Sequence, residues 1–384
     1  MNILVIGAGM MGRAIAYDLL KYSNFKNITL IDNDKKSLEL VNNFLKKSKI
    51  NYCLLDLNSK KDINKQFQKN DIVISAVPYT FNLRLTKTAI KNKCHFLDLG
   101  GNNDVVKAQR KLFNEAKSNN ILILPDCGLS PGMTSVITHD LVDNLDEIES
   151  VKIRVGGLPL DPKPPFDYQI VFSPNGLINE YLEDATVLEN GKIQKKPSLT
   201  ELEEIIFPEP FGTLEAFITS GGTSTLPYTY ENRIKFLDDK TIRYPGHCEK
   251  FKLFLDIGMG NIKPLKIGDQ TIVPRDILIN LLLKHIPTKG QDVVLIKVMG
   301  YGKTNNENVN IEYYLIDYYD KDNNITAMMR TTGYPISIIA QMIEQKIITT
   351  PGVYANEEII PTELFFNELK KRNIVIKKKI NRLC

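Results

Sequence analysis

The strongest constraint on the fold lies in the first 32 residues. Residues 2–6 form a short, continuous apolar run, which is typical of a strand buried on both faces. A G-x-G-x-x-G pattern follows directly, and a stretch of helical periodicity comes after it. In such a turn the first glycine permits a tight bend, the second lets the backbone approach a pyrophosphate, and the third lets the helix pack against the strand. The pattern predicts a dinucleotide held at a helix N-terminus by Gly7, Gly9, Met10, Met11 and Gly12.

A carboxylate follows at the spacing that this kind of site requires. A second apolar run, residues 27–31, ends at Asp32, 20 residues beyond Gly12. A carboxylate at this place accepts hydrogen bonds from both ribose hydroxyls and repels the additional phosphate of NADP. No arginine follows Asp32, although Lys35 and Lys36 do. We therefore expect NAD as the cofactor, with NADP as the less favoured alternative.

Three more residues are expected near the dinucleotide. Asp56 follows the third predicted strand, where it either meets the adenine or serves as a helix cap or turn residue. Val77 and Pro78 end the fourth predicted strand, at the edge where doubly wound sheets bind ligands. A plain strand end is the alternative for these two residues.

Length and composition restrict the class of protein. A chain of 384 residues exceeds what one compact core usually holds, so two domains are expected. A net charge of +4, evenly spread, argues against a nucleic-acid partner. Five cysteines without a CxxC pair favour a reducing cytoplasm over a disulfide framework. The chain starts directly on a strand pattern and has no long apolar run, so neither a signal peptide nor a membrane partner is expected.

The pattern of elements changes near Gly128. Before it, strands alternate with helices, which predicts a doubly wound parallel sheet. After it, runs with alternating polar positions predict a mainly antiparallel sheet; these runs are residues 150–155, 167–172, 241–244, 293–299 and 312–319. Helical periodicity returns from about Met328, and the lysines at 377–379 are expected to form a solvated tail.

Several motifs resemble the saccharopine dehydrogenase-like family. They are Val77-Pro-Tyr79, Asp98-Leu-Gly-Gly101, Gly128-Leu-Ser-Pro-Gly132, Gly156-Gly-Leu-Pro159 and Phe172-Ser-Pro-Asn-Gly-Leu177. Residues 214–225 and 244–250 look particularly like the subgroup of L-lysine 6-dehydrogenases. The resemblance implies an α/β fold whose Rossmann domain, residues 1–128, is completed by residues 329–384. It also implies an α+β substrate-binding and oligomerisation domain of residues 129–328, in a homodimer or homotetramer.

The resemblance further implies NAD-dependent oxidative deamination of an amino acid at its side-chain amine. The subgroup converts L-lysine to the 6-semialdehyde, which cyclises. Such a reaction needs a cation for the distal carboxylate, a group that accepts a proton from the amine, and exclusion of water at the reacting carbon. No metal is expected, because hydride transfer needs none and the four histidines lack metal-ligand spacing.

Five residues are candidates for contact with the substrate. Arg243, in the family's Thr-x-Arg-Tyr motif, and Arg233 are the candidate carboxylate anchors, with a solvated surface arginine as the alternative for each. Thr223 and Ser224 offer hydroxyls on a glycine loop, although turn residues have the same composition. Gly157 belongs to one of the family motifs.

Four residues are candidate catalytic groups. His247 follows Pro-Gly in a predicted loop exposed to a cleft, where it acts as a base unless it is a packing residue. Tyr79 and Asp104 match positions near the active site of saccharopine-forming relatives, and Asp104 equally suits the cap of a helix that starts at Val105. Cys127 lies at the domain junction, where a buried, inert thiol is the alternative.

Other functions fit the same sequence. Saccharopine reductases condense an aldehyde with glutamate, usually use NADPH, and need cations for additional carboxylates. The second domain has few arginines and none follows Asp32, which favours a smaller substrate. Other amine dehydrogenases, including a carboxynorspermidine type, remain alternatives. A non-catalytic NAD-sensing protein would also keep the glycine pattern.

Overall fold

The computed structural model describes residues 1–46 and 48–382, and the chain divides into two compact units. Unit 1 comprises Met1–Asp140 and Met329–Val375, and unit 2 comprises Leu141–Met328 and the segment from Ile376 onward. This division differs from the expected one at two places. Residues 129–140 belong to unit 1, and the segment after Val375 belongs to unit 2 because its strand pairs in the second sheet.

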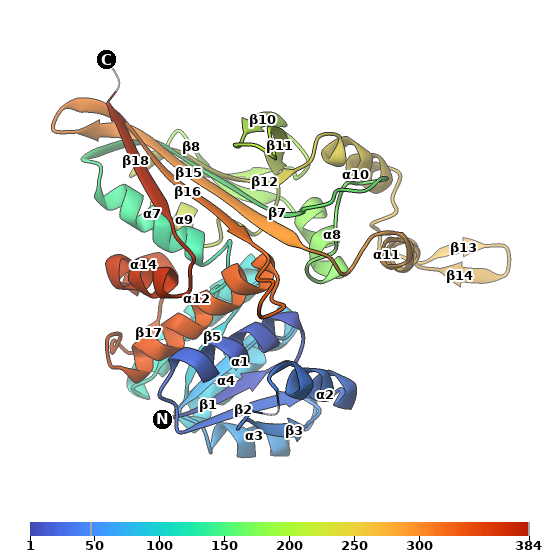
Figure 1. The fold of residues 1–384 in the computed structure, drawn as a ribbon, viewed down its shortest axis with the longest axis vertical. Helices are drawn as coiled ribbons and strands as arrows, with labels where there is room; N and C mark the ends of the chain where they lie inside the picture. The colour runs from blue at the N-terminus through green and yellow to red at the C-terminus, as the bar shows by residue number, and fades with distance from the viewer. Residues whose placement is uncertain (47, 383–384) are drawn as a thin grey trace. The chain divides into compact units, whose positions relative to one another are not determined.

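Unit 1 contains a seven-stranded parallel sheet in the order β17-β6-β5-β4-β1-β2-β3. Figure 1 labels β17, β5, β1, β2 and β3 of this sheet. Its strands are β1 (Asn2–Ile6), β2 (Asn27–Asp32), β3 (Asn51–Leu54), β4 (Ile72–Ser75), β5 (His95–Asp98), β6 (Leu122–Leu124) and β17 (Gly352–Val353). Its helices are α1 (Met10–Tyr22), α2 (Lys35–Phe44), α3 (Lys60–Phe67), η1 (Tyr79–Phe81), α4 (Asn82–Asn92), α5 (Asn103–Arg110), α6 (Phe113–Ser118), α12 (Ala327–Glu344), α13 (Asn356–Ile359) and α14 (Thr362–Lys371). The order of the first six strands is that of doubly wound dinucleotide-binding sheets, so the predicted α/β class is confirmed.

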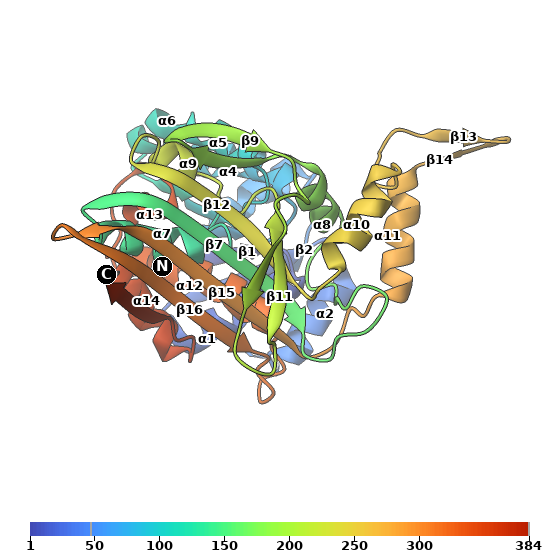
Figure 2. The ribbon, with the colours of Figure 1, turned by 90° about the horizontal axis from the view of Figure 1, so that it is seen from above.

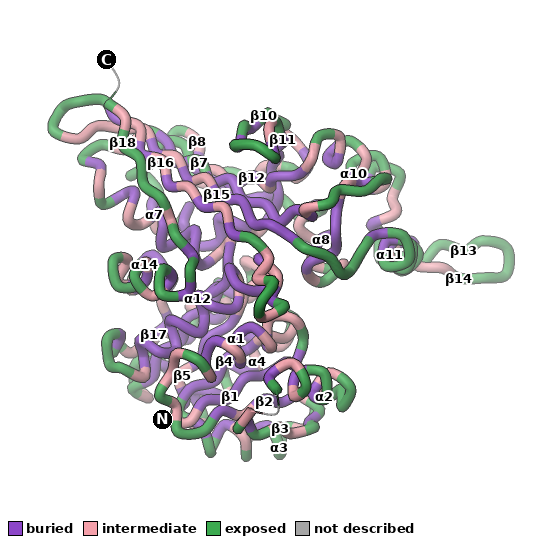
Figure 3. Tube along the Cα trace, in the orientation of Figure 1, coloured by how far each residue is buried: buried purple, intermediate pink, exposed green. Residues whose placement is uncertain are grey.

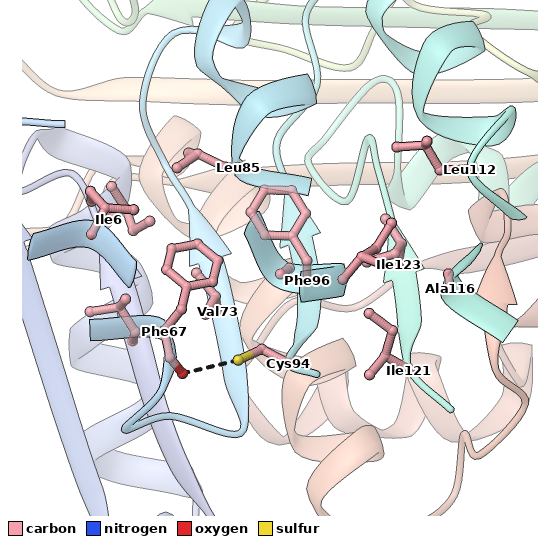
Figure 4. Close-up of a cluster of buried hydrophobic side chains, with 14 of the residues drawn as sticks. Ile6, Phe67, Val73, Leu85, Cys94, Phe96, Leu112, Ala116, Ile121 and Ile123 are labelled. Carbon is pink, nitrogen blue, oxygen red and sulfur yellow. Dashed lines mark hydrogen bonds between the residues drawn. The ribbon is translucent and has the colours of Figure 1, made fainter. Parts of the chain in front are cut away.

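The core of unit 1 is formed by apolar side chains of the parallel strands and of the helices that cover them (Figure 4). Phe67, Val73 and Phe96 are fully buried, and each side chain of this kind contributes about 1.5–3 kcal/mol relative to an exposed one. The Cys94 thiol donates to the carbonyl oxygen of Phe67 at 3.0 Å within this cluster. Strands β1 and β4 are buried almost throughout (Figure 3), as expected for strands with helices on both faces.

The C-terminal segment completes unit 1, as the resemblance implied. Strand β17 extends the sheet by pairing with β6. Arg372, which follows α14, donates to both carboxylate oxygens of Asp18 on α1 at 2.6 and 3.0 Å, and neither side chain is exposed. Gln341 on α12 bonds to both partners. This buried network joins the returning segment to the first helix of the chain.

Unit 2 is built on a nine-stranded sheet in which β7, β15 and β16 are the longest strands (Figure 2). Its main path runs β10-β11-β12-β7-β15-β16-β18, with β8 paired to β12 and β9 to β8. Its strands are β7 (Glu147–Pro159), β8 (Ala185–Glu189), β9 (Lys192–Lys196), β10 (Glu203–Ile206), β11 (Thr213–Ile218), β12 (Ile234–Arg243), β15 (Asp292–Thr304), β16 (Glu307–Tyr318) and β18 (Lys377–Arg382). All pairs are antiparallel except β12 with β7, so the mainly antiparallel second sheet is confirmed.

Helices pack against this sheet, and one small hairpin extends from them. The helices are α8 (Pro174–Leu182), α9 (Leu226–Thr229), α10 (His247–Asp256) and α11 (Pro274–His285), and α7 (Met133–Asp143) crosses the boundary between the units. The hairpin joins β13 (Leu265–Ile267) to β14 (Gln270–Ile272), and residues 261–271 are all exposed. Side chains of α8, α10 and α11 meet in the apolar cluster that supports the site described below.

Two predictions for the second half of the chain are wrong. Residues 167–172 form no strand, because Tyr168 and Ile170 pack into the apolar cluster of α8, α10 and α11 instead of pairing along a neighbour. The lysines at 377–379 are not a solvated tail but the start of β18, whose backbone pairs with β16 while their side chains stay exposed. Charged side chains of this kind are common on edge strands.

We predict that Arg372→Met strongly destabilises unit 1, because the variant leaves the Asp18 carboxylate buried without its cation. Breaking a buried ion pair costs about 3–5 kcal/mol, and the loss should appear as a lower urea midpoint followed by circular dichroism. Arg382→Met is the control, since Arg382 pairs with Glu307 at the surface and should lose less than about 1 kcal/mol. Equal midpoints for the two variants would show that the buried network is dispensable.

Candidate active site

The carboxyl ends of three parallel strands meet at one edge of unit 1. The register of the sheet places Ile6 at the end of β1 between Ile31 of β2 and Ser75 of β4. Gly7, Asp32 and Ala76 therefore emerge together at this edge. In doubly wound sheets with this strand order, ligands bind at this edge.

The glycine turn has the geometry that phosphate binding requires. Gly7 has a φ of 105°, and its N–H donates to the carbonyl oxygen of Ile31 at 2.8 Å. A Cβ on Gly12 would overlap the carbonyl oxygen of Gly7, so only glycine lets α1 begin this close to β1. A Cβ on Gly9 would meet no atom within 4 Å, so the turn is open on that side. Helix α1 begins at Met10 without a side-chain cap, which leaves its first N–H groups available to an anion.

Asp32 lies against the glycine turn. Its Oδ2 accepts a hydrogen bond from the N–H of Ala8 at 2.6 Å, and its Oδ1 accepts one from the N–H of Asp34 at 2.8 Å. Each carboxylate oxygen retains a lone pair that a ribose hydroxyl can use. Asp34 caps α2 with its own carboxylate, so a second negative charge stands close to the first. These residues fit a dinucleotide with unmodified ribose hydroxyls.

The other cofactor candidates differ in position. Val77 is half-buried, and its Cγ1 lies 3.0 Å from the place of a Cβ on Gly7, so it borders the turn. Pro78, next to it, is exposed. Asp56 is exposed and its Oδ1 accepts from the N–H of Asn58 at 2.9 Å, which is the geometry of the turn alternative.

Two of the catalytic candidates follow the fourth and fifth strands. Tyr79 begins η1, and its ring packs beside Gly101, where a Cβ would lie 3.3 Å from Tyr79 Cδ1. Asp104 lies in the first turn of α5 with a side chain that is 91% exposed, and it interacts with Lys107 at 3.8 Å. Asp104 does not cap this helix, because Asn102 accepts the hydrogen bonds from the first N–H groups. The alternative that Asp104 caps this helix is therefore wrong.

Cys127 occupies an environment that suppresses thiolate formation. Its side chain is fully buried, with the thiol 3.3 Å from the carbonyl oxygen of Leu124. Burial, together with the nearby carboxylates of Asp98 and Asp126, raises the pKa of this thiol well above its ordinary value. The arrangement agrees with the inert-thiol alternative, because the thiolate is the reactive form.

Sequence reasoning missed Asp98, the last residue of β5. Its carboxylate is buried and accepts from Gln109 Nε2 at 2.6 Å and from the N–H of Gly100 at 2.8 Å. Burial raises the pKa of Asp98 to about 6. A signal was present in the sequence, since an acid ends an apolar run directly before Leu-Gly-Gly.

In unit 2, Arg243 ends β12 and is held by a chain of hydrogen bonds. Its Nε donates to the hydroxyl of Tyr181 on α8 at 3.1 Å. That hydroxyl lies 3.0 Å from His247 Nε2, and His247 Nδ1 lies 3.1 Å from the carbonyl oxygen of Phe166. A carbonyl oxygen only accepts, so Nδ1 carries the proton and Nε2 accepts from Tyr181. The guanidinium also lies 4.9 Å from the centre of the Tyr168 ring, which gives Arg243 one fixed orientation.

The prediction that His247 lies in a loop exposed to a cleft is wrong. It is the first residue of α10 and is 1% exposed, and Glu215 accepts hydrogen bonds from the backbone on either side of it. Both ring nitrogens are used within the protein. Burial, with the positive charge of Arg243, keeps the pKa of His247 well below its ordinary value. The ring is a neutral link that positions Tyr181.

Arg233 lies far from Arg243. It is exposed, and its guanidinium lies 5.5 Å from the centre of the Tyr230 ring. It precedes β12, whereas Arg243 ends that strand, and ten residues of strand at about 3.3 Å each separate the two by about 30 Å. The structure therefore does not bring the two predicted carboxylate anchors together.

The remaining substrate candidates are packed within unit 2. Thr223 is buried and donates its hydroxyl to the carbonyl oxygen of Thr186 at 2.7 Å. Ser224 is buried in the same turn, with a φ of 39°. Gly157 lies in β7, where a Cβ would meet the side chain of Met328 at 2.5 Å. Close packing thus explains Gly157, and Thr223 has a structural partner for its hydroxyl.

Sequence reasoning also missed Glu180, the neighbour of Tyr181 on α8. Burial raises the pKa of Glu180 to about 8, with the carboxylates of Asp239 and Glu183 adding to the rise and Arg243 opposing it. Over residues 1–46 and 48–382, its carboxylate has neither a hydrogen bond nor an ion pair. No pattern in the sequence distinguishes this residue from the solvated glutamates of other helices.

Two features are absent from the described residues. Among the residues that the structure describes, no group of histidine, cysteine and acidic side chains is arranged to hold a metal ion. Within the same ranges, no helix has the length and apolar character needed to cross a membrane.

The parallel sheet with its glycine turn, joined to a mainly antiparallel second unit, defines a two-unit protein of the dinucleotide-binding class. Residues 3–124 match the family model described as the saccharopine dehydrogenase NADP binding domain. Residues 128–375 match the saccharopine dehydrogenase C-terminal domain. The chain belongs to the saccharopine dehydrogenase family.

Individual relatives agree with this assignment. The L-glutamate-forming, NADP(+) saccharopine dehydrogenase of Saccharomyces cerevisiae is 25% identical over 275 residues, which cover 67% of this chain and 58% of the relative. The mitochondrial alpha-aminoadipic semialdehyde synthase of Bos taurus is 24% identical over 270 residues, or 68% of this chain and 28% of that protein. The match thus spans less than two thirds of each relative.

Solved structures share the fold over nearly the whole chain. The apo saccharopine dehydrogenase (L-Glu forming) of Saccharomyces cerevisiae superposes with a TM-score of 0.81 at 20% identity, covering 99% of both chains. The homospermidine synthase of Legionella pneumophila, solved with NAD, gives a TM-score of 0.66 at 12% identity over 99% of this chain and 91% of the other. The family expected from the sequence motifs is confirmed, whereas these relatives do not carry the name of the L-lysine 6-dehydrogenase subgroup.

We predict that Asp32→Ala weakens NAD binding by about 10-fold or more, because the variant loses charge-assisted hydrogen bonds to the ribose. Discrimination against NADP should fall at the same time. Titrating tryptophan-free protein with NADH and NADPH, followed by the fluorescence of the nicotinamide, measures both constants. Asp56→Asn is the control, since it keeps an acceptor for the turn and should leave both constants unchanged. An Asp32→Ala protein with normal constants would remove Asp32 from the ribose site.

Proposed function

We propose that the chain is an NAD(P)-dependent dehydrogenase that oxidises the carbon beside the side-chain nitrogen of a lysine-derived amino acid. The observation that carries this proposal is that the buried Arg243 has an unused hydrogen-bond donor. Its Nε and Nη1 donate within the protein, while Nη2 has no acceptor among the described residues. A buried guanidinium with a fixed orientation and a donor to spare is suited to a carboxylate.

The names of the relatives suggest which carbon is oxidised. Saccharopine is lysine whose side-chain nitrogen carries a glutarate group. Removing hydride from C6 leaves an imine, and water then releases glutamate and the 6-semialdehyde. The same step on L-lysine releases ammonia and the same semialdehyde, which cyclises. Both substrates of interest thus share one oxidised carbon and differ in what the nitrogen carries.

Saccharopine is the substrate that the relatives support, and one structural observation favours L-lysine. Saccharopine carries three carboxylates. Of the other arginines described in unit 2, Arg154 bonds to Glu203 and Asp238, and Arg275 bonds to the carbonyl oxygen of Gly260 and to Asn179, while Arg233 and Arg382 are exposed. Arg243 is therefore the one buried arginine of the described part of unit 2 with a donor to spare. A single available arginine matches a substrate with a single carboxylate.

The residues at the edge of unit 1 fit a nicotinamide dinucleotide, which accepts the hydride when bound. The open side of the turn at Gly9 and the uncapped start of α1 suit a pyrophosphate. The carboxylates of Asp32 and Asp34 support NAD, whereas the family's domain name supports NADP. The cytoplasmic location expected from the cysteines, and the homodimer or homotetramer implied by the resemblance, stay predictions.

The chemical step makes a demand on the part of the site that receives the side-chain amine. Hydride leaves a carbon that bears a neutral amine, yet the side-chain ammonium of lysine has a pKa of about 10.4. A buried, weakly polar site favours the neutral amine.

The direct test is the reduction of NAD and NADP, followed by absorbance, with L-lysine, L-ornithine and saccharopine. We expect reduction with L-lysine or saccharopine, with a rate that rises at alkaline pH because more of the amine is neutral. L-ornithine, which is one carbon shorter, should react poorly because its amine stops short of the reacting position. No reduction with either lysine skeleton would end the dehydrogenase proposal.

A second test addresses Arg243. We predict that Arg243→Ala raises KM for the amino acid about 10-fold or more while the cofactor constants stay unchanged, because a charge-assisted contact with the carboxylate is lost. Arg233→Ala is the matched control and should change neither KM for the amino acid nor the cofactor constants. Arg233 is exposed and lies about 30 Å from Arg243 along β12. A normal KM in Arg243→Ala would exclude Arg243 as the anchor.

A further inference from the structure

Unit 2 contains an acid beside the carboxylate anchor that the reaction itself does not require. Glu180 and Tyr181 are neighbours on α8, and the Tyr181 hydroxyl accepts from Arg243 Nε at 3.1 Å. Glu180 and Arg243 act on each other electrostatically but do not approach within ion-pair distance. Among the described residues, the carboxyl of Glu180 and Nη2 of Arg243 therefore have no hydrogen-bond partner.

Arg243 is buried and Glu180 is half-buried, and a polar group withdrawn from water is costly unless something bonds to it. In unit 2 the two unused groups have opposite character, because a carboxylate accepts and Nη2 donates. The α-carbon of an amino acid bears a carboxylate and an ammonium side by side. A donor and an acceptor that stand near each other without touching are complementary to that pair.

We propose that Glu180 and Arg243 together form a receptor for the zwitterionic head group of an α-amino acid, with Glu180 binding the α-ammonium and Arg243 the α-carboxylate. The inference rests on the proposed function in placing an amino acid in unit 2. It deepens that proposal by assigning the acid to recognition of the α-amino group. The lysine side chain separates its amine from the head group by four methylenes, so a group beside the carboxylate anchor meets the α-ammonium rather than the reacting nitrogen.

The surroundings of Glu180 make binding depend on pH. Arg243 and Asp239 act on it electrostatically from β12, and Glu183 acts from the C-terminal end of α8, which it follows. Tyr168 and Tyr181 lie in the apolar cluster of the same helix. Burial raises the pKa of Glu180 to about 8, so the carboxyl of the ligand-free protein is mostly protonated at neutral pH. A bound ammonium favours the carboxylate, so binding releases a proton. Affinity should therefore increase as the pH rises from about 6 towards 8, by up to about 10-fold per pH unit.

The experiment uses probes that cannot undergo the reaction. L-Norleucine has the lysine head group without a side-chain amine, and hexanoate has the carboxylate alone. Calorimetric titration of the full chain with each, with and without NAD, measures the head-group site by itself. We expect norleucine to bind about 10-fold or more tightly than hexanoate, and Glu180→Gln to remove most of that difference while hexanoate binding stays unchanged.

Three comparisons separate this proposal from a structural role for Glu180. Glu180→Asp keeps the charge and should retain part of the norleucine affinity. Glu183→Gln removes an exposed carboxylate of the same segment and should retain nearly all of it. The pH dependence of norleucine binding between 6 and 8 should be lost in Glu180→Gln alone.

The outcomes also separate this inference from the proposed function. Equal affinities for norleucine and hexanoate in the unaltered protein, or equal weakening of both by Glu180→Gln, would overturn the receptor. If norleucine binds as expected but neither lysine nor saccharopine reduces NAD(P), the receptor stands and the dehydrogenase proposal fails. If a lysine skeleton is oxidised but norleucine does not bind, the receptor fails alone.

Discussion

The close approach of helix α1 to strand β1 is the constraint on which the nucleotide end of this protein depends. A side chain at Gly12 would overlap the carbonyl oxygen of Gly7, so the helix can start at the strand end only because that position is glycine. The same helix carries Asp18, whose buried bonds to Arg372 join it to the returning C-terminal segment. One element thus positions the phosphate site and connects the two distant stretches of chain that make unit 1.

Unit 2 meets a different physical demand, which is to keep a guanidinium buried and oriented. Arg243 is 4% exposed, and such a charge is stable only when most of its donors are bonded, as Nε and Nη1 are. The chain from Arg243 through Tyr181 and His247 to the Phe166 carbonyl has one consistent direction of donation. Satisfied networks of this kind are rigid, and rigidity is what a binding group needs. The neutral His247 therefore contributes orientation rather than proton transfer.

Local sequence patterns were sufficient to predict most of the elements of unit 1. A buried strand, a glycine turn and a helix lie within a few residues of each other, so Gly7 and Gly12 were predicted with their roles in the turn, and Asp32 with its place at the end of the second strand. The patterns failed where a segment's neighbours decide its structure. Residues 167–172 alternate like a strand but fill an apolar cluster, and the lysines at 377–379 look like a tail but pair with β16. Backbone pairing with a strand more than 60 residues away, such as that of Lys377 with Tyr314, leaves no trace in the composition of either segment.

The amino-acid order alone was enough to predict the dinucleotide-binding class and the family, and to single out Arg243 as a candidate, because short-range motifs carry them. Contacts between residues distant in the sequence decided where the other candidate residues lie. Only the folded chain revealed that His247 is buried at a helix start, that Asp104 is solvated, and that Arg233 lies at the far end of β12. The same holds for Glu180, since its carboxyl is unusual only through the burial and the charges that α8 and β12 bring together. Electrostatic environment is a property of three-dimensional neighbours, and no single-residue pattern encodes it.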